Sequence, residues 1–222
     1  MIAAVLWDMD GTLVDSEPAW VRAQGALAAR FGREWTQADA LALIGSTMEQ
    51  TAEALQSAGV ELADAEVEAA LERDVLADMR RGLAWRPGAR ELVREVHRAG
   101  VPQAIVTTSS RLLAQVVVDA LATEVPLAAL VTGDDVSRGK PHPEPYLLAA
   151  ATLGVDIACC VAVEDSPTGL AAAVASGARA IGVPHDAELA AGDDRTIWAT
   201  LAGRGLRDLV ELAEARHRRP HD

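Results

Sequence analysis

The chain has 222 residues with 50% hydrophobic content, enough for one packed core with a smaller insert. Its formal net charge of −13 at pH 7 argues against nucleic acid or an anionic membrane as a partner, because both require clustered Lys and Arg. No apolar run approaches the roughly 20 residues of a membrane-spanning helix, and the N-terminus shows no basic leader. We therefore expect a cytoplasmic protein.

The first predicted element is a buried strand formed by the apolar run Ile2–Trp7. Asp8 and Asp10 follow it directly, at the strand end where ligands bind in open parallel sheets. If the segment stays extended, these two carboxylates share one side, and their like charges then need a cation or a shared proton. A divalent metal ion is the simplest solution.

Residues 16–85 predict an all-helical insert, because they carry helical apolar spacing and no convincing strand. Ser16 and Pro18 are suited to begin a first helix that extends to about Phe31. Three more helices are expected, with glycine-containing turns between them, at Thr36–Leu43, Thr47–Ala58 and Asp64–Arg81. We therefore expect two domains, a discontinuous core (1–15 and 86–222) and a helical domain (16–85).

From Pro87 onward, strand and helix patterns alternate, which predicts an α/β fold with a Rossmann-like, mostly parallel sheet covered by helices on both faces. The expected strands are Gln103–Val106, Ala128–Val131, Cys159–Val163 and Ala178–Val183, with a further edge strand around Trp198. The expected helices are Pro87–Ala99, Arg111–Leu121, Pro143–Leu153, Pro167–Ser176 and Leu206–Ala213. A short basic tail begins at Arg216.

The two cysteines, Cys159 and Cys160, are adjacent in the predicted strand. Neighbours on a strand point to opposite faces, so we expect two small buried side chains and neither a disulfide nor a metal pair.

Polar residues follow three of the predicted strands, at the edge that Asp8 also occupies. They are Thr107, Thr108 and Ser109 after one strand, Lys140 in the loop after Val131, and Glu164 and Asp165 after another. Four carboxylates at one edge offer the hard oxygen ligands that Mg²⁺ prefers. Lys140 is the single lysine among twenty basic residues, and with Thr107 it would complete a clamp for a phosphate group.

Four segments, in order, resemble the motifs of the haloacid dehalogenase-like (HAD) hydrolase superfamily. They are Asp8-Met9-Asp10-Gly11-Thr12, Thr107 after an apolar strand, Lys140 before Pro141, and Glu164-Asp165-Ser166. The helical insert follows the first motif, where members of the β-phosphoglucomutase-like branch carry a helical cap. The resemblance spans nearly the whole chain and implies the HAD fold with a cap domain.

The resemblance also implies roles for individual residues. Asp8 would be the nucleophile that forms an aspartyl-phosphate, and Asp10 the general acid and base. Thr107 and Lys140 would hold the transferring phosphoryl group, with Thr108 and Ser109 also contacting substrate.

The same resemblance implies a Mg²⁺ site made by the Asp8 carboxylate, the Asp10 backbone carbonyl, Asp165 and Glu164. A plainer alternative exists for three residues of these motifs. Thr107 and Ser109 would suit the cap of the following helix, and Asp165 the cap of the next.

Asp10 argues against the dehalogenases and ion-pumping ATPases of the superfamily, which lack this second acid. Phosphonate hydrolysis in the superfamily requires a lysine in the cap. The only lysine of this chain is Lys140, outside the helical insert, so this activity is excluded. In β-phosphoglucomutase a histidine and an arginine serve the cap side of the site, and their apparent counterparts here are Trp20 and Met48. We therefore expect a phosphatase acting on a small phosphorylated metabolite, with Trp20 and Met48 facing either the substrate or the cap core.

Two alternatives stay open: a sugar-phosphate mutase, and a non-catalytic module that binds phosphorylated metabolites. The second would be marked by loss of Asp8, Asp10 or Lys140, and none is lost. A monomer is the expected oligomeric state.

Overall fold

The computed structural model describes residues 2–43 and 46–215. The chain divides into two compact units: the residues up to Asp15 together with those from Trp85 onward, and Ser16–Ala84. The second crossing lies one residue earlier than expected, because Trp85 forms an antiparallel bridge with Val14 of the first unit. The basic tail from Arg216 and the turn at Gly45 lie outside the described residues.

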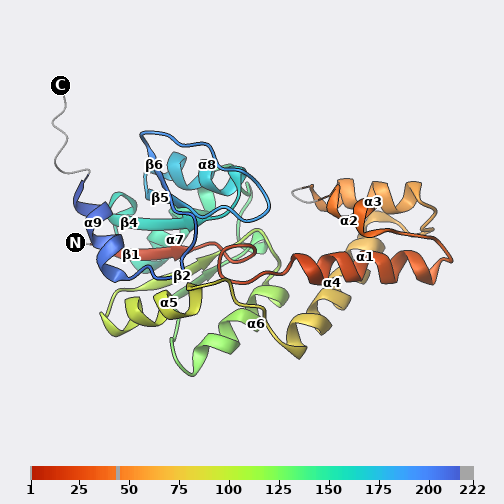
Figure 1. Ribbon diagram of the computed structural model, residues 1–222, viewed down its shortest axis with the longest axis horizontal. Coiled ribbons are helices and arrows are strands. Elements are labelled where there is room, and N and C mark those ends of the chain that lie inside the picture. The colour runs from red at the N-terminus through yellow and green to blue at the C-terminus, as the bar shows by residue number, and fades with distance from the viewer. Residues whose placement is uncertain (1, 44–45, 216–222) are drawn as a thin grey trace. The chain divides into compact units, whose positions relative to one another are not determined.

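The first unit is built on a six-stranded sheet in which every neighbouring pair is parallel (Figure 1). The strands are β1 (Ala4–Trp7), β2 (Gln103–Val106), β3 (Ala129–Val131), β4 (Cys160–Glu164), β5 (Arg179–Gly182) and β6 (Arg195–Ile197). Their order is β3-β2-β1-β4-β5-β6, so β1 and β4 lie at the centre. This doubly wound order confirms the Rossmann-like α/β class.

The edge strand expected around Trp198 exists, but it ends at Ile197. Trp198 follows it directly, and its backbone N–H still donates to the carbonyl of Gly182 at 2.8 Å.

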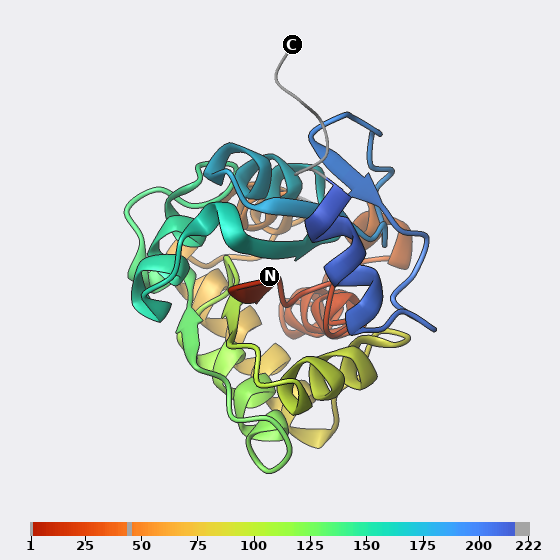
Figure 2. The ribbon, with the colours of Figure 1, turned by 90° about the vertical axis from the view of Figure 1, so that its left-hand side faces the viewer.

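The central strands β1, β2 and β4 are buried along their whole length, because helices cover both faces of the sheet (Figure 2). The helices are α5 (Ala89–Arg98), α6 (Arg111–Ala122), α7 (Glu144–Leu153), α8 (Pro167–Ser176) and α9 (Leu206–Ala215). Helices α7 and α8 contact one face, where Leu6, Ala162 and Tyr146 share one buried cluster. Small alanines such as Ala149 and Ala173 belong to the same cluster, which brings these helices close to the strands.

Two short 3₁₀ helices, η1 (Gly133–Asp135) and η2 (Ile157–Cys159), were not expected from the sequence. Because η2 takes up Cys159, strand β4 begins only at Cys160. The expectation of two buried cysteines on opposite strand faces is therefore wrong for Cys159, which is half-buried. Cys160 is buried, and both thiols are free.

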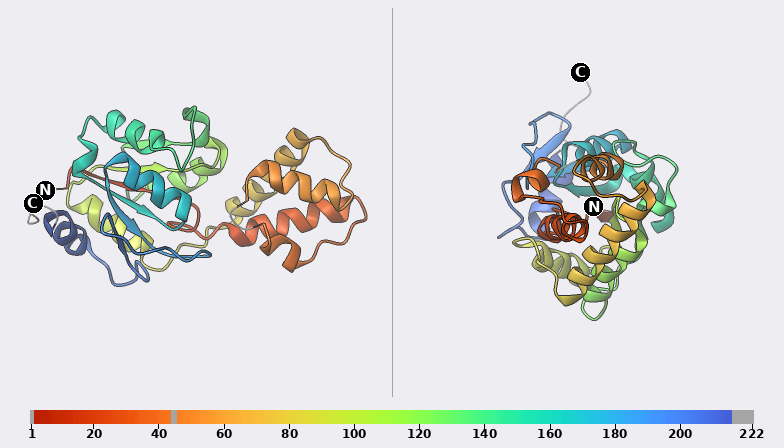
Figure 3. Two further views of the ribbon diagram at one scale, coloured as in Figure 1. Left: turned by 90° about the horizontal axis from the view of Figure 1, so that it is seen from above. Right: turned by 90° about the vertical axis from the view of Figure 1, so that its right-hand side faces the viewer.

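The second unit consists of α1 (Glu17–Arg30), α2 (Gln37–Leu41), α3 (Met48–Ser57) and α4 (Asp64–Arg81), seen in Figure 3. Thr36 and Thr47 cap α2 and α3 by accepting a hydrogen bond from the backbone of the third helical residue. Leucines Leu27, Leu55 and Leu71 form part of its buried interior.

Helices α1 and α4 of this unit are joined by two ion pairs, Arg22 with Asp78 and Arg30 with Asp74. No strand occurs in its described part. Among the described residues of the whole chain, no helix is both long and apolar enough to cross a membrane.

We expect Gly88→Ala to destabilise the first unit more than Gly100→Ala. Both glycines flank α5 with positive φ, +82° and +73°, so alanine is strained at either site. A Cβ at Gly88 would also lie 2.2 Å from the backbone oxygen of Leu201, whereas nothing lies within 4 Å at Gly100. In chemical denaturation, Gly88→Ala should cost at least about 1 kcal/mol more, from overpacking. Equal losses in the two variants would contradict the close approach.

Candidate active site

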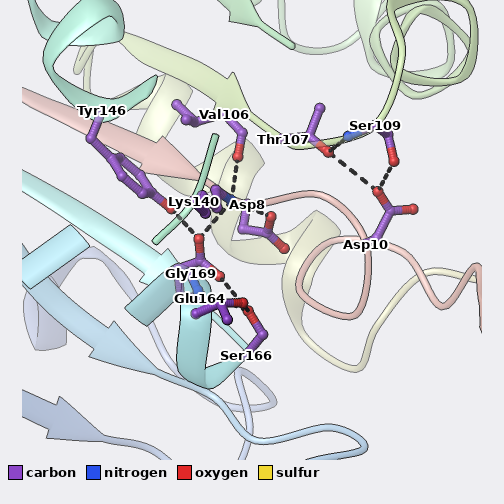
Figure 4. A network of polar contacts seen from close by, with 11 residues as sticks. Asp8, Asp10, Val106, Thr107, Ser109, Lys140, Tyr146, Glu164, Ser166 and Gly169 are labelled. Atoms are coloured by element: carbon purple, nitrogen blue, oxygen red, sulfur yellow. Dashed lines mark hydrogen bonds and ion pairs between the residues drawn. The ribbon is translucent and has the colours of Figure 1, made fainter. Parts of the chain in front are cut away.

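The candidate residues converge at the carboxyl ends of β1, β2 and β4 (Figure 4). Strand order reverses between β1 and β4, and doubly wound sheets bind ligands in the crevice at this point. The backbone continues the pairing just past the strands: the N–H of Asp8 donates to Val163 O, and that of Thr107 to Val131 O, each at 2.9 Å. The sheet itself therefore fixes where these two side chains begin.

Lys140 lies at the centre of the site, with its side chain only 4% exposed. Its ammonium is 2.6 Å from Asp8 Oδ1 and 2.6 Å from Glu164 Oε1, and it donates to Val106 O at 2.8 Å. These three partners match the three donors of an ammonium. Burial alone would lower the pKa of Lys140, but the charges of Asp8 and Glu164 outweigh it and raise the pKa. Lys140 is therefore charged at neutral pH.

Glu164, the last residue of β4, is completely buried. Its Oε1 accepts from the Tyr146 hydroxyl as well as from Lys140. Its other oxygen lies in space left by Gly169, where a Cβ would stand 2.0 Å from Oε2. Burial, and next the charge of Asp8, raise the pKa of Glu164, while Lys140 opposes them.

Tyr146 and Gly169 were not predicted as site residues from the sequence, although both contribute to the surroundings of Glu164. The available signal for Tyr146 was that it is the chain's only tyrosine and follows Lys140 by six positions. The signal for Gly169 was its place within α8, because glycine destabilises a helix and is therefore expected there only for another reason, such as close packing.

Asp8, Glu164 and Asp165 form an acid cluster in which one ligand oxygen from each lies within 4.8 Å of the others. Asp8 Oδ2 is buried and has no hydrogen-bond partner among the described residues. Burial, followed by the charges of Asp8 and Glu164, raises the pKa of Asp165. These features fit a hard divalent cation such as Mg²⁺. The ion would give the buried Asp8 oxygen a partner and would offset the repulsion between the three carboxylates.

Gly11 makes room for this acid cluster. Its φ of +81° turns the chain after β1, and a Cβ there would lie 2.0 Å from Asp165 Oδ2. The turn is closed by the N–H of Gly11, which donates to Val14 O at 2.7 Å.

The Asp10 carboxylate lies apart from the acid cluster, against the loop that follows β2. Its Oδ2 accepts from Ser109 Oγ at 2.7 Å and, at a longer 3.3 Å, from Thr107 Oγ1. The two aspartates of the first motif therefore have separate partners: Asp8 pairs with a cation and Asp10 with hydroxyls.

The alternative of helix capping is wrong for Thr107, Ser109 and Asp165. The cap of α6 is Ser110, whose hydroxyl accepts from Leu113 N, and the cap of α8 is Ser166, which accepts from Gly169 N at 3.1 Å. Each true cap is the serine directly before its helix, so the motif side chains remain available to the site.

Three further candidate residues have less specific surroundings. Thr108 is exposed on the loop after β2. Trp20 on α1 and Met48 at the start of α3 belong to the second unit, and both are half-buried.

A parallel sheet that presents a lysine–aspartate pair and an acid cluster at its switch point is typical of Rossmann-like hydrolases with an aspartate-based site. The family model for haloacid dehalogenase-like hydrolases matches residues 2–177, and the chain belongs to this family. The predicted superfamily is thus confirmed, and the chain is an enzyme of the hydrolase class.

Its relatives include several phosphatases. Hexitol phosphatase A of Escherichia coli (strain K12) is 37% identical over 183 residues, covering 82% of this chain and 83% of the relative. Validoxylamine A 7′-phosphate phosphatase of Streptomyces hygroscopicus subsp. limoneus is 32% identical over 200 residues, covering 87% and 92%. The crystal structure of CbbY from Rhodobacter sphaeroides in complex with phosphate has a TM-score of 0.79 and 32% identity, covering 95% of this chain and 100% of that one. The chain thus falls in the phosphatase branch of the family.

We expect Tyr146→Phe to lower the free energy of unfolding by roughly 1.5–3 kcal/mol, because Glu164 stays buried and loses a donor to a charged group. The matched control is Thr152→Val on the same helix, which removes an exposed hydroxyl bonded to Leu148 O and should change stability by less than about 0.5 kcal/mol. Chemical denaturation measures both. Equal small changes would show that the tyrosine hydroxyl does not support Glu164.

Proposed function

We propose that the enzyme is a Mg²⁺-dependent phosphatase that hydrolyses a small phosphate monoester through an aspartyl-phosphate on Asp8. The observation that carries the proposal is the state of the Asp8 carboxylate. One of its oxygens is 2.6 Å from the buried ammonium of Lys140, and the other is buried without a hydrogen-bond partner among the described residues. A carboxylate fixed in this way is suited to attack phosphorus.

The relatives support the substrate class. Two of them are named as phosphatases, one for hexitol phosphates by its name and one for validoxylamine A 7′-phosphate, and CbbY binds phosphate in its crystal structure. A phosphate group is common to all three names, and a small phosphorylated metabolite is therefore the proposed substrate.

In the proposed reaction, an Asp8 oxygen bonds to phosphorus while the bond from phosphorus to the leaving oxygen breaks. Asp10 gives that oxygen a proton, so an alcohol departs. Asp10 then takes a proton from water as the water oxygen attacks phosphorus, the bond to Asp8 breaks, and phosphate is released. Lys140 and Thr107 hold the phosphoryl group in line and offset its charge.

The proposed Mg²⁺ ligands are the carboxylates of Asp8, Glu164 and Asp165 with the backbone carbonyl of Asp10. When bound, the ion supplies positive charge beside the phosphoryl oxygens. Because burial raises the pKa of Glu164 and of Asp165, a divalent cation would also favour their ionised forms.

We further propose that the helical unit, residues 16–84, is a cap and that Trp20 and Met48 contribute to the substrate side of the site. These two side chains supply no charge for a second phosphate, which favours hydrolysis over mutase action. A monomer, a cytoplasmic location, and the absence of nucleic-acid and membrane partners stay predictions.

We expect Asp8→Asn to lower Mg²⁺-dependent hydrolysis of p-nitrophenyl phosphate by at least about a thousandfold, because the nucleophile is lost. Asp119→Asn, on the exposed face of α6, is the matched control and should retain wild-type activity. Release of p-nitrophenolate measures both variants.

Full activity in Asp8→Asn would contradict the proposal, as would wild-type protein that releases phosphate from no member of a panel of phosphorylated sugars, sugar alcohols and nucleotides. The same panel separates hydrolysis from mutase action, because only hydrolysis releases inorganic phosphate.

Adding Mg²⁺ should raise the melting temperature of the wild-type protein, because the ion binds the folded acid cluster and not the unfolded chain. Linkage gives about 2.7 kcal/mol of stabilisation at an ion concentration 100 times the dissociation constant. Asp165→Asn should reduce this shift strongly, whereas Asp119→Asn should keep it, and chelation should reverse it. Thermal melting measures the effect without any substrate, and an unchanged shift in Asp165→Asn would place the ion elsewhere.

A further inference from the structure

We propose that Ser109 is a positioning residue for Asp10, and that its hydroxyl selects the Asp10 oxygen that carries the catalytic proton. The inference rests on the proposed function, since it assigns a task within that reaction. It differs from a contact with substrate, because Ser109 would act through Asp10.

The first observation is the pair of hydroxyl groups that reach Asp10 (Figure 4). Ser109 Oγ donates to Asp10 Oδ2 at 2.7 Å, the usual length for a strong O–H···O bond, while Thr107 Oγ1 lies 3.3 Å from the same oxygen. Thr107 Oγ1 also accepts from the backbone N–H of Ser109 at 3.0 Å. Ser109 therefore makes the shorter contact and also helps to orient the longer one.

The second observation is that the backbone of Ser109 is held from two sides. Its N–H donates to Thr107 Oγ1, and its carbonyl accepts from the N–H of Gly133 at 3.1 Å. Gly133 begins η1, and a Cβ there would lie 2.5 Å from the backbone oxygen of Thr108. The loop after β2 thus lies directly against the loop after β3, which limits any relaxation of Ser109.

The third observation is that the Ser109 hydroxyl has no structural duty at the helix. Ser110 caps α6, so the hydroxyl of Ser109 is not needed for the first turn. Its side chain is half-buried and directed at Asp10.

The chemical consequence follows from what a neutral carboxyl group can do. Such a group has one oxygen that donates its proton and one that only accepts. Because Oδ2 of Asp10 accepts from Ser109, the proton is placed on Oδ1. In the first step that proton passes from Oδ1 to the leaving oxygen as its bond to phosphorus breaks and the bond from Asp8 forms. In the second step a proton of the attacking water returns to Oδ1, and Ser109 donates to Oδ2 throughout.

The test compares two substrates of similar size that differ in their need for an acid. Phenolate leaves slowly unless it is protonated, whereas 2,4-dinitrophenolate leaves without help. The ratio kcat/KM reports steps up to formation of the aspartyl-phosphate, so the second step does not enter. Ser109→Ala should lower kcat/KM for phenyl phosphate by roughly tenfold or more, within the range of general acid catalysis, and for 2,4-dinitrophenyl phosphate by less than about twofold.

Two further variants separate positioning from a general structural effect. Ser109→Thr restores a hydroxyl and should recover most of the phenyl phosphate activity. Ser110→Ala makes the same chemical change one residue later, at the cap of α6, and should leave the ratio between the two substrates unchanged.

An equal loss on both substrates in Ser109→Ala would overturn the inference in favour of substrate contact, and unchanged values on both would overturn it as well. Wild-type protein that releases neither phenol nor dinitrophenol in the presence of Mg²⁺ would instead overturn the proposed function.

Discussion

The structure of the site depends on one buried ammonium group. Lys140 joins Asp8 after β1, Val106 at the end of β2 and Glu164 at the end of β4, so a single side chain links the three central strands at one edge. Loss of one partner of a buried ion pair leaves an uncompensated charge, which typically costs about 3–5 kcal/mol. The contact that fixes one oxygen of the Asp8 carboxylate is therefore also part of what holds the sheet edge together.

One cation is too few for the acids that surround it. Lys140 contacts Asp8 and Glu164, and Asp165 adds a third carboxylate to the cluster. Burial raises the pKa of both Glu164 and Asp165. Asp10 has a different environment, since its carboxylate accepts hydrogen bonds from the hydroxyl groups of Ser109 and Thr107. Two aspartates only two positions apart thus have different surroundings, and such differences are what allow two carboxylates of one site to differ in proton affinity.

The sequence predicts the strands of this sheet well because each central strand is a short apolar run bounded by turn residues, and the motif residues follow those runs directly. It does not predict contacts that only the folded chain creates. The Tyr146 hydroxyl on Glu164 and the Ser109 hydroxyl on Asp10, 99 positions apart, leave no local pattern. Predictions of local detail are also wrong where a shift of one residue matters. A 3₁₀ helix includes Cys159, which therefore lies outside the strand, and the cap of α6 is Ser110 and not Ser109.

The pairing of Val14 with Trp85 has a consequence for how the chain is put together. The N–H of Arg86 also donates to Leu13 O at 2.9 Å. Together these contacts join the segment that leads into the helical unit to the segment that returns from it. For the folding of the sheet, Ser16–Ala84 is then a long insertion whose two ends are held together. The entropic cost of closing such an insertion rises only slowly with its length. The helical unit can therefore be lengthened, shortened or replaced without rebuilding the edge of the sheet at which Asp8 lies.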